Sequence, residues 1–312
     1  MAITDRVYAG DEDYARMRAL LRVIYPLTVP AVYCTVGDLD WWRWTHAEGD
    51  DIGGARLWFA NDDLVGFAYP GKDEVDLMVH PDHRAIEDAM LAWAEARRVE
   101  TATTARVEGP IGFNAWSFAT DTSREDTLRR RGYAKQEGEF LCFRARALEA
   151  PVPEPAPPPG YAVRHVRGED DLARRVAVHR NAFAPSRMTA AKHRAVMASP
   201  TYRPDLDLVA EAPDGSFAAF CIVWFDPDNR IGVFEPVGTH SAHRRRGLAT
   251  ALLCAGMRRL QSLGARVAHV NSWAVAPPAA ALYDAAGLTE IGRNHRWKRD
   301  LVDTRRSDRS EE

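Results

Sequence analysis

The chain has 312 residues, of which 46% are hydrophobic and 27% are charged, and its formal net charge is −3. This balance is ordinary for a globular protein and suits two domains of roughly 150 residues each. Acidic and basic residues are mixed along the chain, which argues against a nucleic-acid binder, because such proteins usually carry a basic excess or stripe.

The four cysteines lie far apart and form no Cys-x-x-Cys pair. This spacing argues against a zinc site and against a secreted disulfide scaffold, so we expect no metal. The N-terminal residues lack the apolar core of a signal peptide, and the chain has no run of 18 apolar residues. We therefore expect a cytoplasmic protein without a membrane span.

The first half alternates short apolar segments with amphipathic ones. In chain order, this pattern predicts a strand at 3–8, helices at 13–24 and 36–46, a hairpin formed by 55–60 and 64–69, a strand at 74–80, a helix at 85–99, a strand at 105–109, a helix at 123–131 and a strand at 139–146.

The segment 150–160 is rich in proline, which fixes φ and removes a backbone donor. It predicts an extended, stiff linker between one domain at 1–149 and a second at 161–312. The alternative is a proline-rich motif that binds a partner.

The second half has a clearer pattern. It predicts a strand at 161–166, helices at 170–183 and 190–198, strands at 206–211, 217–225 and 231–239, a helix at 247–263, a strand at 267–271, a helix at 277–286 and a final strand at 289–301. Both halves thus have the order β-α-α-β-β-β-α-β-α-β. We predict an internal repeat of one α/β fold, each copy a mixed central sheet flanked by helices.

A basic loop joins a strand to the long helix of the second half, with the sequence Arg244-Arg245-Arg246-Gly247-Leu248-Ala249. A glycine there lets the backbone approach a ligand closely. The free N–H groups and the dipole at a helix start attract a pyrophosphate. The alternative is an ordinary helix N-terminus without a ligand.

Arg-x-x-Gly-x-Ala after a strand resembles the acyl-CoA signature of the GNAT acetyltransferases, Arg/Gln-x-x-Gly-x-Gly/Ala. The stretch from Pro278 to Tyr283, followed by Gly287 and Leu288, is similar to the family's Asn-x-x-Ala-x-x-Leu-Tyr…Gly-Phe region. The resemblance covers residues 161–300, and it implies two tandem GNAT-like domains.

The resemblance also implies that acetyl-CoA is the cosubstrate, held where two central parallel strands splay apart. The residues that it assigns to acetyl-CoA are Val237, Gly238 and Thr239 for the pantetheine arm, and Arg244, Arg245, Arg246, Gly247, Leu248, Ala249 and Thr250 for the pyrophosphate. Ala276 stands where the family usually has Asn. Asn271 or Ser272 could make that contact instead.

Direct acetyl transfer to an amine needs two proton movements. An alkylammonium with a pKa of roughly 10 must lose a proton, and the CoA thiolate must gain one. Glu235 is the candidate base, because alternation along its strand places it on one face with Val237 and Thr239. Tyr283 is the candidate acid, since it matches the tyrosine that family members aim at the CoA sulfur. The alternatives are a structural glutamate and a tyrosine packed in the core.

The first half carries a matching stretch from Val79 to Ala89, but Glu87 stands where glycine is expected and Asp88 follows it. Two carboxylates there would repel a pyrophosphate. Residues 1–149 are therefore predicted to be a degenerate GNAT-like domain without an acyl-CoA site, with a structural or substrate-shaping role.

Three tryptophans, Trp41, Trp42 and Trp44, lie close together on a predicted early helix. In this fold, the first two helices commonly border the acceptor groove. The three side chains could form a wall of that groove or of a domain boundary. The alternative is a small hydrophobic core.

These features predict an N-acetyltransferase that moves an acetyl group from acetyl-CoA directly to the primary amine of a small molecule. One alternative is a sensor or scaffold that binds acyl-CoA without turnover, and another is a protein-lysine acetyltransferase. A homodimer is compatible with the sequence, which names neither the acceptor nor the acyl length.

Overall fold

The computed structural model describes residues 2–45, 54–273 and 277–302. The chain forms two compact units, each made of segments that are not contiguous in the sequence. Unit 1 comprises Met1–Cys34, Ile52–Leu141 and Gly292–Glu312, and unit 2 comprises Thr35–Asp51 and Cys142–Ile291. Each unit therefore takes a segment from the opposite half of the sequence.

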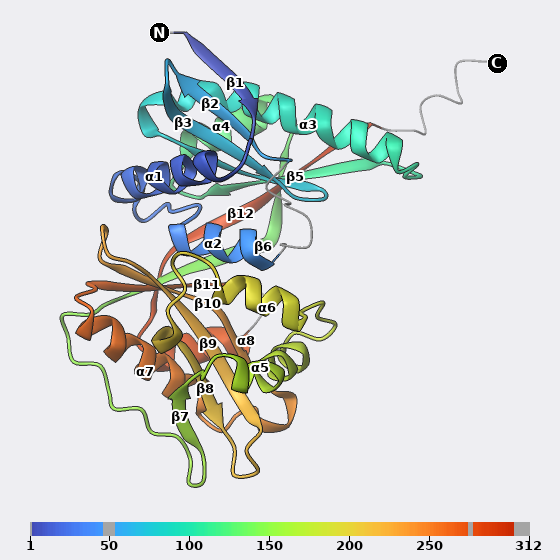
Figure 1. Cartoon of the computed structure of the whole chain (residues 1–312). Helices are drawn as coiled ribbons and strands as arrows, with labels where there is room; N and C mark the ends of the chain where they lie inside the picture. Colours follow the sequence, from blue (N-terminus) through green and yellow to red (C-terminus); the bar gives the residue numbers. More distant parts are fainter. Residues whose placement is uncertain (1, 46–53, 274–276, 303–312) are drawn as a thin grey trace. The chain divides into compact units, whose positions relative to one another are not determined.

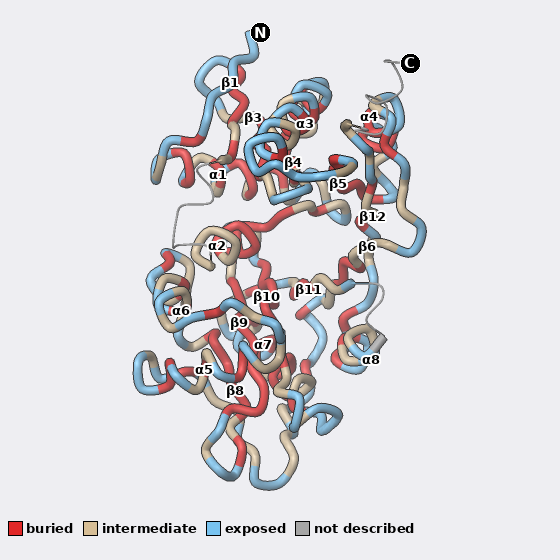
Figure 2. The backbone as a smooth tube through the Cα atoms, turned by 90° about the vertical axis from the view of Figure 1, so that its right-hand side faces the viewer, coloured by how far each residue is buried: buried red, intermediate tan, exposed pale blue. Residues whose placement is uncertain are grey.

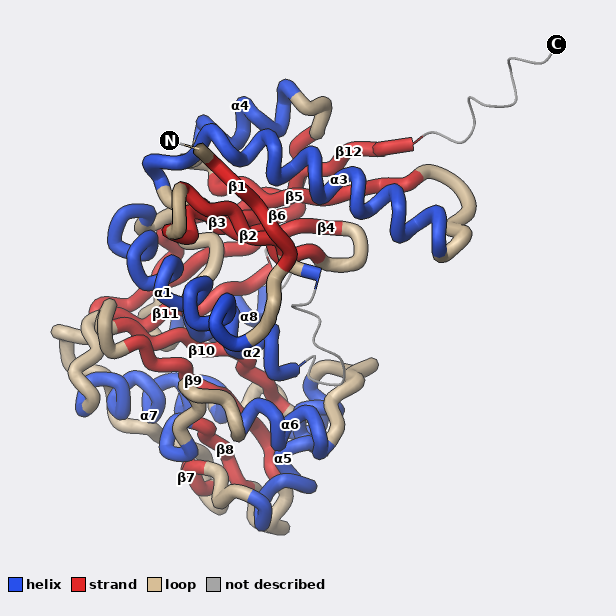
Figure 3. Tube along the Cα trace, turned by 45° about the horizontal axis from the view of Figure 1, so that its top comes forward, coloured by secondary structure: helices blue, strands red, loops and turns tan. Residues whose placement is uncertain are grey.

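The helices and strands follow the predicted order in both halves (Figures 1 and 3). The first half contains β1 (Ile3–Val7), α1 (Asp11–Thr28), α2 (Val36–Thr45), β2 (Arg56–Ala60), β3 (Asp63–Pro70), β4 (Glu74–Val79), the 3₁₀ helix η2 (Pro81–Ile86), α3 (Glu87–Thr104), β5 (Ile111–Phe118), α4 (Thr122–Arg130) and β6 (Ala134–Ala147). The second half contains β7 (Ala162–His165), α5 (Glu169–Ala182), α6 (Ala190–Met197), the 3₁₀ helix η3 (Pro204–Leu206), β8 (Asp207–Glu211), β9 (Phe217–Asp226), β10 (Ile231–Thr239), the 3₁₀ helix η4 (Ser241–His243), α7 (Leu248–Ser262), β11 (Val267–Trp273), α8 (Pro277–Ala285) and β12 (Thr289–Val302).

The strand predicted at 105–109 is wrong. Helix α3 continues to Thr104, and the backbone then turns through positive φ at Arg106 and Gly109. Positive φ is incompatible with an extended strand. The strand β5 begins only at Ile111, after Pro110.

The predicted mixed α/β fold is confirmed, and each unit has one parallel strand pair among antiparallel ones. In unit 1, β4 pairs in parallel with β5, and β5 is bordered by the unit 1 part of β12. In unit 2, β10 pairs in parallel with β11. The neighbours β7, β8, β9 and β10 are antiparallel.

Helices cover both faces of the sheet in unit 2. On one face, Gly256 of α7 lies against the rings and methyl groups of Phe234 and Val223. On the other, Ala182 of α5 lies against Gly238 of β10. Figure 2 shows the buried residues gathered in the strands between these helices. No helix within the described segments is long and apolar enough to cross a membrane.

The repeat extends to individual polar contacts at the start of the first helix in each half of the sequence. In α1, the carboxylate of Asp13 is bound by the backbone N–H of Ala9 at 2.8 Å and by the guanidinium groups of Arg6 and Arg16. In α5, the carboxylate of Asp171 has the same set of partners, the N–H of Arg167 at 2.8 Å and the guanidinium groups of Arg164 and Arg174. Every spacing is the same, so both halves begin with one conserved cap.

The proline-rich segment, which we predicted to be an extended and stiff linker, contacts α7 of unit 2. Val152 is buried in the core cluster of α7, and its carbonyl accepts a hydrogen bond from Arg258 at 3.1 Å. Gln261 donates to the carbonyl of Leu148 at 2.7 Å. The stretch between the halves therefore lies along α7.

Helix α2 packs very closely on β9 because it has a glycine at the contact. A Cβ atom on Gly37 would lie 2.4 Å from the Cβ of Trp224, closer than real carbon atoms approach. This contact fixes the position of α2, and with it the adjacent Asp38, over the sheet of unit 2.

We predict that Gly37→Ala lowers the free energy of unfolding by about 1–3 kcal/mol, although alanine is normally the better helix former by about 1 kcal/mol. Denaturant unfolding followed by tryptophan fluorescence measures this. The control is Gly112→Ala, whose Cβ would meet the flexible end of Lys298 and, at an ordinary contact distance, Oδ1 of Asp300. Equal stability of the two variants would contradict the close-packing argument.

Candidate active site

The loop before α7 exposes backbone N–H groups to solvent. Gly247 caps the helix with φ 75°, and Arg245 has φ 62°, so two residues of the loop are left-handed. A Cβ on Gly247 would have no atom within 4 Å, which leaves open space beside the helix start. Consecutive N–H groups in such a loop form a concave anion site.

Tyr161 orients the basic side chains of this loop. Its hydroxyl accepts a hydrogen bond from Nη1 of Arg246 at 3.0 Å and lies 2.9 Å from Nδ1 of His243. The sequence pattern gave no sign of this contact, because Tyr161 lies 85 positions before Arg246. Tyr161 therefore holds the positively charged side chain of Arg246 at one side of the start of α7.

Strand β10 contains a β-bulge at the candidate base. The pairing with β9 moves from Phe234↔Val223 to Val237↔Cys221, so three steps on β10 match two on β9. As a result, Phe234 and Val237 both pack against the α7-side cluster. The regular alternation that we assumed for Glu235, Val237 and Thr239 is therefore wrong, because a bulge shifts the facing of every later residue.

The parallel strands β10 and β11 pair only from Ile231↔Val267 to Val233↔His269. Asn271 lies two residues beyond the last pair, and its Oδ1 atom is buried with no hydrogen-bond partner among the described residues. A buried acceptor without a donor is costly. Asn271 is thus placed to accept a hydrogen bond from a ligand that lies between the two strands. Ala276, where the family usually has Asn, is outside the described residues.

The surroundings of Glu235 change the pKa of its carboxyl group. Burial, together with the negative charge of Asp38, raises the pKa of Glu235 to about 8. Its backbone carbonyl accepts a hydrogen bond from Nε1 of Trp224 at 2.7 Å, which holds the bulge in place. A carboxyl group with this pKa can gain and lose a proton near neutral pH.

Asp38 is a residue that the sequence reasoning missed. Its carboxylate accepts hydrogen bonds from the N–H of Thr35 at 2.8 Å and from the Thr35 hydroxyl at 2.7 Å, and the Asp38 N–H donates back to that hydroxyl at 3.2 Å. This is a capping box, so the Thr-x-x-Asp pattern looks structural in the sequence. Burial raises the pKa of Asp38 as well.

Tyr283 lies in α8 and is 6% exposed. Burial, and then the negative charge of Glu235, raise the pKa of its hydroxyl, which keeps the phenol protonated. Within the described segments, no group forms a hydrogen bond with this hydroxyl. The structure thus brings Tyr283 and Glu235 into one electrostatic neighbourhood, with Asp38 beside Glu235.

The tryptophans of α2 belong to unit 2. Trp41 and Trp44 are half-buried against a cluster formed by Val196, Ile222, Trp224 and Val233. Trp41 also lies 6.2 Å, between ring centroids, from His179 of α5. Part of each indole is core, as the alternative interpretation expected, and part stays exposed.

Comparison with known proteins agrees with these features. Residues 180–288 match the model of the "Acetyltransferase (GNAT) family". A mycothiol acetyltransferase of Pseudarthrobacter chlorophenolicus is 30% identical over 256 residues, which cover 77% of this chain and 74% of the relative. A mycothiol acetyltransferase of Kineococcus radiotolerans is 32% identical over 220 residues, 68% of this chain and 66% of the relative. The chain belongs to the GNAT acetyltransferase family.

Solved structures show the same fold over nearly the whole chain. A GCN5-related N-acetyltransferase from Sphaerobacter thermophilus aligns with a TM-score of 0.68 at 21% identity and covers 96% of this chain and 97% of its own. A tandem GNAT protein from the clavulanic acid biosynthesis pathway aligns with a TM-score of 0.63 at 16% identity, over 97% and 100%. The protein is thus a tandem GNAT protein and an acetyl-CoA-dependent N-acetyltransferase.

The loop of unit 1 that corresponds to the loop before α7 follows the same backbone path, but it lacks the open space found at Gly247. Nδ1 of His80 accepts from the N–H of Asp82 at 3.2 Å, as Nδ1 of His240 accepts from that of Ala242 at 3.2 Å. Glu87 occupies the place that Gly247 has in unit 2. It is 1% exposed, so its side chain fills that place.

The carboxylate of Glu87 is paired with two guanidinium groups, Nε of Arg84 at 2.6 Å and Nη2 of Arg124 at 2.7 Å. Glu87 thus fills the space that a pyrophosphate needs, and its negative charge lies against both guanidinium groups. This observation supports the proposal that unit 1 has no acyl-CoA site.

The residues of unit 2 fit acetyl-CoA on three structural grounds: the open space at Gly247, the exposed basic loop and the unpaired Oδ1 of Asn271. Within the described segments, no group of three or more His, Cys, Asp or Glu residues is arranged to hold a metal ion.

We predict one acetyl-CoA site per chain by isothermal titration calorimetry, and at least 100-fold weaker binding for Gly247→Glu, which adds bulk and a negative charge at the cradle. Gly247→Asn should lose less affinity, since asparagine tolerates positive φ and adds no charge. Glu87→Gln should leave the affinity unchanged. Two sites per chain, or full affinity in Gly247→Glu, would contradict this assignment.

Proposed function

We propose that the protein transfers the acetyl group of acetyl-CoA to the primary amine of a small molecule, with Glu235 as the proton acceptor and Tyr283 as the proton donor. The observation that carries this proposal is that Glu235 lies within electrostatic reach of both Asp38 and Tyr283, in the same unit as the open loop at Gly247.

The acceptor arrives as an ammonium ion, which cannot attack a carbonyl carbon until it loses a proton. Two buried carboxyl groups that lie near each other attract such a cation, and the cation in turn favours their ionised forms. Glu235, with its pKa near neutrality, takes the proton directly or through a water molecule. Asp38, fixed by Thr35, holds the charge of the bound ammonium.

Acetyl-CoA supplies the acetyl group as a thioester when bound. The free amine attacks the acetyl carbon, and the carbon–sulfur bond breaks as the carbon–nitrogen bond forms. Tyr283 donates its proton to the departing sulfur, and the nitrogen releases its second proton to solvent, which returns a proton to the Tyr283 oxygen. Glu235 gives up its own proton to solvent before the next turnover, and no residue of the chain becomes acylated. The phenol suits this role because its raised pKa keeps it protonated until the sulfur becomes basic.

We further infer that the loop residues Arg244–Thr250 hold the pyrophosphate, that Val237, Gly238 and Thr239 align the pantetheine arm, and that Asn271 accepts one of its N–H groups. The end of the β10–β11 pairing at Val233↔His269 supports this inference, because it leaves the later backbone groups on that edge of β10 for a ligand.

A small-molecule acceptor is favoured over a protein lysine. Relatives that are 28% to 32% identical to this chain are named mycothiol acetyltransferases. Helix α2 also packs on β9 and β10 and brings two half-buried indoles against the cluster that contains Trp224 and Val233. Amines related to mycothiol are therefore the first acceptors to test, by CoA release.

We predict that kcat/KM rises with pH through about 8 as Glu235 ionises, and that Glu235→Gln lowers kcat by about 10²–10⁴-fold and removes that rise. The same variant should be more stable than the wild type at pH 9. The folded-state pKa lies above the ordinary 4.5, so the wild type loses stability as the pH rises from 4.5 through about 8. Full activity in a stable Glu235→Gln protein would refute the role of the base.

Tyr283→Phe should lower kcat by about 10²-fold or more and leave the affinity for acetyl-CoA unchanged, because it removes only the proton donor. Stopped-flow measurement of CoA release and calorimetry together test this. The matched control is Tyr133→Phe, whose hydroxyl bonds Glu95 in unit 1. A Tyr283→Phe enzyme as fast as the control would exclude the tyrosine as acid.

A further inference from the structure

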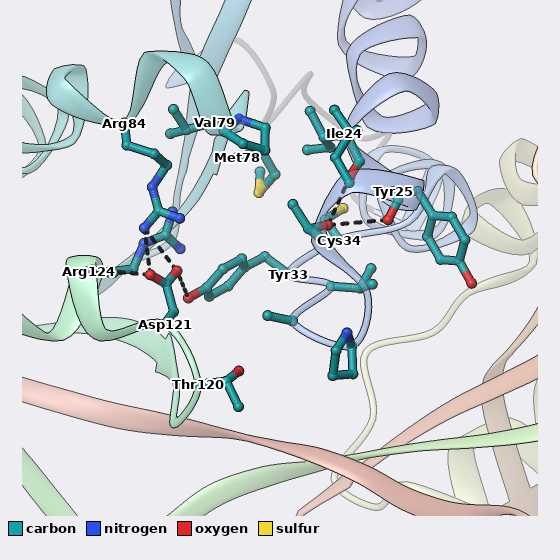
Figure 4. Close-up of a pocket in the computed structure, with 16 residues that line it drawn as sticks. Ile24, Tyr25, Tyr33, Cys34, Met78, Val79, Arg84, Thr120, Asp121 and Arg124 are labelled. Carbon is teal, nitrogen blue, oxygen red and sulfur yellow. Dashed lines mark hydrogen bonds and ion pairs between the residues drawn. The ribbon is translucent and has the colours of Figure 1, made fainter.

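Unit 1 contains a cavity of about 260 Å³ that the proposed chemistry does not use. It opens where β4 and β5 stop pairing, since their parallel contacts end at Glu74↔Asn114 and Val75↔Ala115. The lining comes from the end of α1, the segment 30–34, the end of β4, η2 and the residues around the start of α4 (Figure 4).

One end of the cavity is polar. Asp121 accepts hydrogen bonds from Nη2 of Arg84 at 2.8 Å, from the hydroxyl of Tyr33 at 2.7 Å and from the N–H of Arg124 at 3.1 Å. Figure 4 shows the two guanidinium groups and Tyr33 converging on this carboxylate. The other carboxylate, Glu87, is held by the same two arginines. The acidic oxygens at this end are thus occupied.

Hydrogen-bond donors remain at the same end. Within the described segments, no partner is found for Nη1 of Arg84, for Nη1 of Arg124 or for the hydroxyl of Thr120. Both arginines and Thr120 line the cavity, and the Arg84 side chain is 26% exposed. A ligand group that accepts hydrogen bonds and carries negative charge therefore fits this end best.

The remainder of the lining is largely apolar. Ile24 and Val32 are buried in the wall, and Met78 and Val79 contribute from β4. Leu27 also lines the cavity, yet it is 57% exposed, so apolar surface is left without protein cover. A hydrocarbon group placed here would cover it.

The size of the cavity limits the ligand. A cavity of about 150 Å³ accommodates benzene, whereas pockets for drug-sized ligands begin at about 300 Å³. The cavity of unit 1 lies between these limits, so it suits a molecule of six to ten heavy atoms, roughly. A whole acyl-CoA is too large, and Glu87 blocks its phosphates.

We propose that this cavity is a binding site for a small monocarboxylate with a short hydrocarbon tail, whose carboxylate meets Arg84 and Arg124 and whose tail lies among Ile24, Val32, Met78 and Val79. The site is separate from the acetyl-transfer chemistry proposed for unit 2. Its retention explains why the opening between β4 and β5 remains after the loss of the phosphate cradle.

The test uses hexanoate as the probe and the full chain, by calorimetry and ligand-observed NMR. Hexanoate should bind at one saturable site, with hexan-1-ol at least tenfold weaker and hexylamine without detectable binding. Saturating acetyl-CoA should leave hexanoate binding unchanged. Displacement of hexanoate by acetyl-CoA would place the probe in unit 2 and overturn the proposal, as would equal binding of hexan-1-ol.

Two variants locate the site. Arg84→Gln should weaken hexanoate at least tenfold, while Arg129→Gln, which removes an exposed arginine of α4, should not. Because Arg84 also pairs with Glu87 and Asp121, a second variant, Ala31→Leu, reduces the cavity from its apolar side and should weaken hexanoate without any loss of charge. Undiminished binding in both Arg84→Gln and Ala31→Leu would refute the proposed site.

Discussion

In both units, two parallel strands pair over only a few residues and then separate, and both units depend on this separation. β10 leaves β11 after three paired residues, and β4 leaves β5 after two. Backbone and side-chain polar groups beyond such a fork lose their sheet partners and need others. Unit 2 has open space at the helix start at Gly247, whereas unit 1 has at the corresponding position the side chain of Glu87, which pairs with Arg84 and Arg124.

The two copies of the fold share contacts that hold the backbone, and they differ in the residues proposed to carry out the chemistry. The caps at Asp13 and Asp171 have the same partners at the same spacing, and the turns at His80 and His240 share one geometry. The helix end at Gly132 repeats the one at Gly287, which places Leu128 where unit 2 has Tyr283. Strand β4 also pairs with β3 without a bulge from Val75 to Val79. Unit 1 thus lacks the features that make Glu235 and Tyr283 candidates.

The sequence predicted the order of the elements in both halves because apolar periodicity and turn residues are local signals. Prediction from the sequence failed where a contact between residues far apart in the chain determines the local structure. The helix end at Thr104 and the turn at Arg106 and Gly109 displaced a strand from 105–109. The bulge at Glu235 depends on pairing with β9, which no period-2 pattern reveals. Asp38 was missed because its capping-box spacing has a complete local explanation, and its proximity to Glu235 arises only when α2 packs on β9 through Gly37.

The division of the chain into interleaved units also bears on synthesis at the ribosome. Unit 2 requires Thr35–Asp51, which emerges before most of unit 1, and unit 1 requires Gly292–Glu312, which emerges after all of unit 2. Until β12 arrives, the edge of β5 that it covers in unit 1 stays without its antiparallel partner, and an open edge strand invites wrong pairing. A nascent chain that has passed the proline-rich segment therefore still holds two incomplete units. Neither unit is complete until the second half has been made, and a cut at that segment would separate each unit from a strand or helix that it needs.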